Sequence, residues 1–109
     1  MAEDLGKTSS GLQPNMAGLL AYVLGLVSGL IFFLTEKNNT FVRFHAMQSI
    51  CLSAGLVVAE IVLSFIPILI VLVRCVGIAL WIVCMIKAYQ GQWFRLPVAG
   101  DIAAKQAGL

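Results

Sequence analysis

The feature that most constrains this chain is its long apolar stretch from Ala46 to Ala88, which carries only three charged residues. A helix needs roughly 20 apolar residues to cross the hydrocarbon core of a bilayer, and this stretch is about twice that length. One continuous helix would extend far beyond the membrane. We therefore expect a helical hairpin made of two membrane-spanning helices.

Pro67 marks the turn of this hairpin. Proline disfavours helical geometry at the residue before it and is well placed in the first turn of a new helix. The expected spans are therefore residues 46–66 and 67–88. A kink at Pro67 within one long helix is the alternative, and the mismatch with the bilayer thickness argues against it.

A further apolar run, residues 16–34, contains no charge and is followed by a polar loop. It is long enough for a first span, and Asn39 or Thr40 is expected to cap the helix after the loop. With 61% hydrophobic and 11% charged residues, the chain would be insoluble as a water-exposed globule. We expect a single all-α membrane domain, 1–109, with three transmembrane helices, a polar N-terminal tail, 1–15, and an interfacial C-terminal tail, 89–109.

Basic residues predict the orientation of such a protein, because loops rich in lysine and arginine stay in the cytoplasm. Three spans would place the first loop and the C-terminal tail on one side, together with Lys37, Arg43, Lys87, Arg95 and Lys105. Among the lysines and arginines, only Lys7 would lie on the other side. The expectation is an N-terminus outside and a cytoplasmic C-terminus.

Small residues along the first two expected spans indicate close helix packing. They are Gly18, Gly25, Gly29, Ser49 and Ser53. The GxxxG spacing of Gly25 and Gly29 would also suit a dimer, but packing within one chain is the simpler interpretation.

Glu60 and Arg74 lie at equal sequence distances before and after Pro67, so a hairpin would bring them to a similar depth. A lone charge within a spanning helix costs about 2.5 to 3.5 kcal/mol on insertion scales. We expect the two residues to form an ion pair. A proton or cation site at Glu60 is the functional alternative.

The edges of the expected spans carry aromatic, basic and polar residues that are typical of a membrane interface. The first group lies in the short amphipathic segment 41–48 before the second span. The expected rim, in contact with lipids or partners, consists of Phe41, Arg43, Phe44, His45, Gln48, Lys87, Tyr89, Trp93 and Arg95. Gly100 and Asp101 are expected to start a short final helix, 102–106.

No pattern in the sequence predicts catalysis, a cofactor or a metal site. His45 has no second histidine or carboxylate beside it, and the three cysteines lie in apolar runs without the spacing of a zinc site. The net charge of +2 is small and scattered, which argues against a nucleic-acid surface. The chain is not expected to be an enzyme.

Two segments, FVRFHAMQS (41–49) and WIVCMIKAYQGQWFRLPVAGDIA (81–103), resemble a family of small bacterial and archaeal membrane proteins of unknown function. That family is similar to the Tic20-type component of the chloroplast import translocon and includes the magnetosome membrane proteins MamF and MmsF. The resemblance covers about residues 17–105 and implies a helical protein of a bacterial or archaeal cell membrane.

The function expected from these observations is that of a scaffold or accessory subunit. Such a protein would pack with itself or with a larger membrane complex, among membrane lipids and without nucleic acid. A component of a transport or protein-translocation pore is the alternative, which the resemblance to Tic20-type proteins implies.

Overall fold

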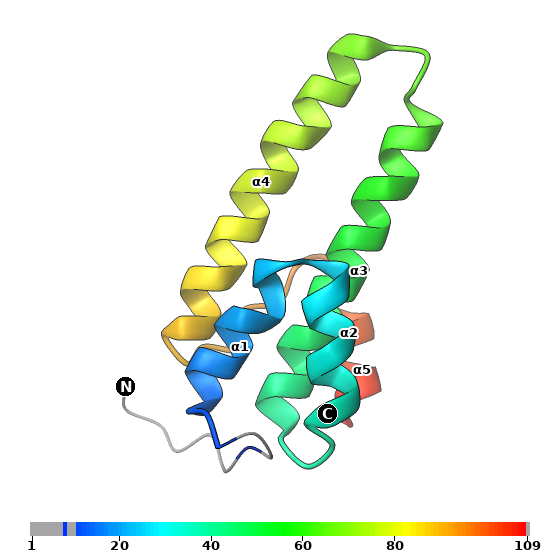
Figure 1. The fold of residues 1–109 in the computed structure, drawn as a ribbon. Coiled ribbons are helices and arrows are strands. Elements are labelled where there is room, and N and C mark those ends of the chain that lie inside the picture. Colours follow the sequence, from blue (N-terminus) through cyan, green and yellow to red (C-terminus); the bar gives the residue numbers. More distant parts are fainter. Residues whose placement is uncertain (1–7, 9–10, 109) are drawn as a thin grey trace.

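The computed structural model describes residue 8 and residues 11–108, so most of the expected tail 1–15 lies outside the described residues. The described part is all-helical. Its five helices are α1 (Pro14–Val23), α2 (Leu26–Thr35), α3 (Thr40–Val62), α4 (Pro67–Tyr89) and α5 (Ala99–Ala107) (Figure 1). The helices α3 and α4 are long and apolar enough to span a membrane, and α2 is a shorter apolar helix.

The helices α3 and α4 form a hairpin that turns just before Pro67. Each has 23 residues, or about 34 Å of helix. Pro67 lies in the first turn of α4, where the proline's missing N–H is not needed. Asn39 caps α3, because its side-chain oxygen accepts a hydrogen bond of 2.9 Å from the backbone N–H of Val42. The segment 41–48 is therefore not separate from the second helix but forms the first turns of α3.

The expectation of one continuous helix over residues 16–34 is wrong. The chain turns back at Leu24 and Gly25, so α1 and α2 lie antiparallel as a short hairpin (Figure 1). Gly25 has a φ of +59°, which glycine adopts without a steric penalty. Ser28 stabilises the turn: its hydroxyl accepts from Leu24 N (3.0 Å) and donates to Ala21 O (2.9 Å). Each helix has 10 residues and is about 15 Å long, half of a bilayer core.

The chain after α4 also turns back instead of leaving the helices. Gly91, with a φ of +78°, begins this turn, and residues 92–98 run without helical structure along α3. The helix α5 then packs on α3, with Ala103, Ala104 and Ala107 against Phe44. The expected helix 102–106 is thus longer, and part of the expected interfacial tail is packed into the fold.

Two regions result from these turns. In the base, α1, α2, α5 and residues 92–98 surround the first half of α3 and the end of α4 (Figure 1). The apical hairpin, residues 55–78, consists of the end of α3, the turn and the start of α4, and it extends beyond the other helices with most of its large apolar side chains exposed.

The turn between α1 and α2 changes the expected topology. The start of α1, the loop between α2 and α3 and the end of α5 all lie at the same end of the molecule (Figure 1). Residues 16–34 therefore do not carry the chain from one end to the other. The expected placement of the two chain ends on opposite sides assumed that residues 16–34 cross the membrane once, and the turn between α1 and α2 removes that assumption.

Candidate functional site

A buried polar cluster lies where α1 and α3 meet residues 92–96. His45 Nε2 lies 2.8 Å from the carbonyl oxygen of Gln92, and its Nδ1 lies 2.7 Å from the hydroxyl of Tyr22. A carbonyl oxygen only accepts, so Nε2 carries the proton in the neutral ring. Nδ1 then accepts from Tyr22. His45 thus joins α1 to the chain that follows α4.

Gln48 lies one turn after His45 and is fully buried. Its side-chain nitrogen donates to the carbonyl of Phe94 (2.8 Å) and to the hydroxyl of Tyr22 (2.9 Å). Its side-chain oxygen accepts from the backbone N–H of Leu96 (2.9 Å). The amide group therefore binds the backbone on both sides of Arg95, as a neighbouring β-strand would.

These contacts explain how a non-helical segment is tolerated next to membrane-spanning helices. Backbone N–H and C=O groups in a membrane must find partners within the protein, because the hydrocarbon core offers none. In residues 92–96, three such groups bind His45 and Gln48. We call His45, Gln48 and Tyr22 the backbone clamp.

The expected rim is therefore wrong for its central members. Phe41, Phe44, His45 and Gln48 are buried and do not face lipid. The rings of Phe41 and Phe44 lie edge-on to His45, with centroids 4.6 and 5.0 Å away, and both also contact Trp93. The cause is the return of residues 92–98, which cover this face of α3. The other rim residues, Arg43, Lys87, Tyr89, Trp93 and Arg95, are partly or largely exposed.

Small residues bring the α1–α2 hairpin against its neighbours in the same chain. A Cβ atom on Gly18 would lie 3.1 Å from the ring of Phe41, and one on Gly29 would lie 2.9 Å from a backbone oxygen of α3. Ser49 donates a 3.0 Å hydrogen bond to the carbonyl of Gly25. Ser53 also faces this turn, because a Cβ on Gly25 would lie 2.8 Å from its hydroxyl.

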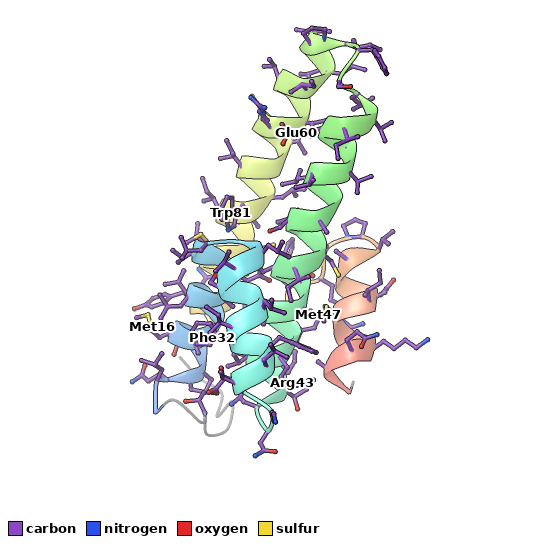
Figure 2. All side chains as sticks on the ribbon, turned by 45° about the vertical axis from the view of Figure 1, so that its right-hand side comes forward. Met16, Phe32, Arg43, Met47, Glu60 and Trp81 are labelled. Atoms are coloured by element: carbon purple, nitrogen blue, oxygen red, sulfur yellow. The ribbon has the colours of Figure 1, made fainter. Side chains whose placement is uncertain are left out.

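Glu60 and Arg74 come together on the apical hairpin, far from Arg43 and Met47 at the base (Figure 2). Arg74 donates from Nε (2.8 Å) and approaches through a second nitrogen (2.7 Å), both to the same oxygen of Glu60. The Arg74 side chain is 65% exposed and that of Glu60 34%. The pair thus lies on the surface of an apolar hairpin.

The histidine, cysteine, aspartate and glutamate side chains of the described part of the chain are its potential metal ligands. Residues 8 and 11–108 contain no group of three or more histidine, cysteine, aspartate or glutamate side chains that could hold a metal ion. Cys51, Cys75 and Cys84 are free.

Sequence reasoning missed two members of the polar core. Tyr22 lies in the apolar run of α1, but a buried tyrosine hydroxyl usually needs a partner, and that rule could have identified it. Asn15 is also buried and donates to the carbonyl of Tyr89 (3.0 Å), at the end of α4. Its side-chain oxygen has no hydrogen-bond partner.

Comparison with known proteins connects these segments to a family. The model of the magnetosome magnetite crystal formation protein family, MamF/MmsF, matches residues 9–103. The chain belongs to the MamF/MmsF family. The match includes the backbone clamp and the segment that it binds, residues 92–96.

Archaeal relatives agree with membrane residence. A UPF0132 membrane protein of Methanocaldococcus jannaschii is 52% identical over 102 residues, covering 91% of this chain and 93% of the relative. A UPF0132 membrane protein of Archaeoglobus fulgidus is 50% identical over 101 residues, covering 89% and 98%. Their names identify membrane proteins and state no activity. No solved structure matches the chain.

Proposed function

We propose that this MamF/MmsF family member is a non-catalytic membrane scaffold that associates with a second copy of itself through its apical hairpin. The observation that carries the proposal is the exposed Glu60–Arg74 pair on an otherwise apolar surface. In the base, by contrast, His45 and Gln48 are engaged in holding backbone. The polar groups of Glu60 and Arg74, which lie on the molecular surface, are therefore available for contact with other molecules, whereas those of His45 and Gln48 are not.

An exposed ion pair in a bilayer favours further polar contacts. Charged side chains within membrane-spanning segments generally face a protein interior or a water-filled cavity. Within the described residues, Glu60 and Arg74 bond only each other, and both contacts use one carboxylate oxygen. The second oxygen and the remaining guanidinium nitrogen can bond a partner at the same depth.

A second copy supplies the complementary charges. A two-fold axis along the membrane normal reverses every direction in the membrane plane. The pair of the second copy would therefore point the opposite way, with its arginine beside Glu60 and its glutamate beside Arg74. Such a closed arrangement of four charges makes the hairpin complementary to itself.

The basic residues support an orientation for this scaffold. The exposed cations of the base include Lys37, Arg95 and Lys105, whereas the turn of the apical hairpin, residues 63–67, has none. By the positive-inside rule, the base faces the cytoplasm and the Pro67 turn faces out. The start of α1 is then cytoplasmic together with α5.

The test is self-association in lipid vesicles, measured by energy transfer between fluorescently labelled copies as the protein-to-lipid ratio rises. The wild type should dimerise. The double variant Glu60→Leu with Arg74→Leu should fold, because leucine is favourable on the exposed apolar surface of a membrane helix, but it should dimerise about tenfold or more weakly, given the strength of charged contacts. The swap of Glu60→Arg with Arg74→Glu should dimerise like the wild type, since it preserves both pairings.

Two results would contradict the proposal. A wild type that stays monomeric at all ratios, or a double leucine variant that dimerises as well as the wild type, would exclude this interface. Solute flux through vesicles that contain only this protein would instead favour a pore component over a scaffold.

A further inference from the structure

A groove opens at the base between α2, α3 and α5, away from the Glu60–Arg74 surface. It has a volume of about 550 Å³ and contains two basic side chains. Its lining is Phe33, Leu34, Lys37, Arg43, Gln106, Ala107 and Gly108. Cations and apolar side chains thus line the same groove.

Arg43 is held in place within this groove. One guanidinium nitrogen donates to the carbonyl of Phe33 (2.9 Å), and the guanidinium carbon lies 4.0 Å from the centre of the Phe33 ring. Within the described residues, this is the only hydrogen bond of the Arg43 side chain. Its remaining N–H groups are therefore available to an acceptor, and a planar guanidinium suits the paired oxygens of a phosphate.

The charge of the lining is positive. Lys37 lies in the loop before α3, is exposed, and adds a second cation to the groove. The neighbouring Glu36 is fully buried, has an interaction partner of its own and does not line the groove. The first ligand chemistry that fits is thus an anionic phosphate group.

The apolar side chains of α2 next to the two cations favour a lipid over a free phosphate ion as the ligand. Leu34 lines the groove, and Leu30 and Ile31, one turn earlier on α2, are also exposed. The three residues are spaced three and four apart, so they share one face of α2, and this helix runs away from the groove toward the apical hairpin (Figure 1). Their side chains therefore form an apolar track that begins at the basic site. An acyl chain can lie along this track while its headgroup meets Lys37 and Arg43.

We propose that this groove is a specific binding site for the headgroup of an anionic phospholipid. Basic pockets between membrane helices bind acidic headgroups by this combination of charge and shape. The site does not depend on dimerisation, because all its lining residues come from one chain.

The test uses delipidated protein in a neutral detergent, titrated with short-chain phosphatidylglycerol, phosphatidylcholine or inorganic phosphate. Binding is counted by native mass spectrometry and by the rise in melting temperature. Phosphatidylglycerol should saturate at one site per chain and bind more tightly than phosphatidylcholine. Lys37→Gln should weaken its binding about fivefold, which corresponds to the loss of one cation near a lipid phosphate.

Matched variants separate the site from general charge effects. Lys87→Gln removes the same charge outside the groove and should bind like the wild type. Arg43→Lys, which keeps the charge but loses the planar fork, should bind more weakly than the wild type. Since Arg43 also holds the end of α2, Lys37→Gln is the decisive variant.

Three outcomes would overturn the proposal. These are equal binding of phosphatidylcholine and phosphatidylglycerol, equal loss in Lys37→Gln and Lys87→Gln, and full stabilisation by inorganic phosphate alone. The last would identify a site for free phosphate in place of a lipid.

Discussion

At the scale of single residues, Gln48 has the role of a peptide group. It binds a carbonyl and an N–H on either side of Arg95 and a hydroxyl from α1. A buried backbone group left without a partner costs about 1 to 3 kcal/mol. The side chain therefore carries more of the stability of the base than its size suggests.

Gln48→Leu should destabilise the protein by about 2 kcal/mol or more, since it leaves Phe94 O and Leu96 N without their partner. Thermal unfolding in detergent measures the loss, and amide hydrogen exchange at Leu96 should become faster. Gln92→Leu, an exposed position in the same contact region, is the control and should change little. Unchanged exchange at Leu96 in the Gln48 variant would argue against the clamp.

The sequence identified His45 and Gln48 of this site but not Tyr22, and it did not identify the direction in which they face. Segments 41–49 and 81–103 are the ones that resemble the family, and His45, Gln48 and Trp93 belong to the rim that the sequence predicts. Their placement at a lipid rim failed because helix α3 is apolar on nearly every side, so its periodicity does not indicate which face is covered. The covering segment lies far along the chain, and its extended backbone leaves no pattern of alternating side chains.

At the scale of elements, the turn between α1 and α2 was hidden inside an apolar run. Hydropathy detects the length of a run but not a change of direction within it. The signals that set the turn are Gly25, at φ +59°, and Ser28, which bonds both sides of it. Glycine and serine are also common in continuous membrane helices, so neither predicts a turn by itself.

Gly25→Ala should destabilise the base by about 1 to 2 kcal/mol, because alanine is strained at positive φ. Its Cβ would also lie 2.8 Å from the Ser53 hydroxyl. Gly55→Ala is the matched control: a Cβ there meets nothing within 4 Å, and alanine favours a helix over glycine. Melting temperatures in the same detergent compare the two.

Adding Ser53→Ala to Gly25→Ala should recover only the steric part of the loss. If Gly25→Ala melts no lower than Gly55→Ala, then the turn does not need glycine. In that case a straight helix over residues 16–34 would again be possible.

At the scale of the whole molecule, the hairpin around Pro67 was predictable and the topology was not. The length of the apolar stretch and one proline suffice to predict α3 and α4. The helix α4 nearly matches the expected 67–88, whereas α3 begins six residues and ends four residues before the expected 46–66. The side of the membrane on which each end of the chain lies instead depends on how many times the chain crosses the membrane. A single unrecognised turn at Gly25 reverses the side of everything before it.

We predict that Gln13 and Gln106 lie on one side of the membrane and Ser64 on the other. Single cysteines at these exposed positions, in a chain whose native cysteines are replaced by alanine, can be labelled in intact cells with an impermeant maleimide. The Ser64→Cys variant should react, and the Gln13→Cys and Gln106→Cys variants should react only after lysis. Labels on Gln13→Cys and Gln106→Cys from opposite sides would show that residues 16–34 cross the membrane.

The return of residues 92–107 onto the first half of α3 has a consequence for biosynthesis. The ribosome makes His45 and Gln48 long before the backbone that they bind. The base can therefore close only after residues 92–96 have been made. Until this segment docks, the side chains of His45 and Gln48 lack these backbone partners, so a chain shortened before residue 92 would leave both polar groups without them.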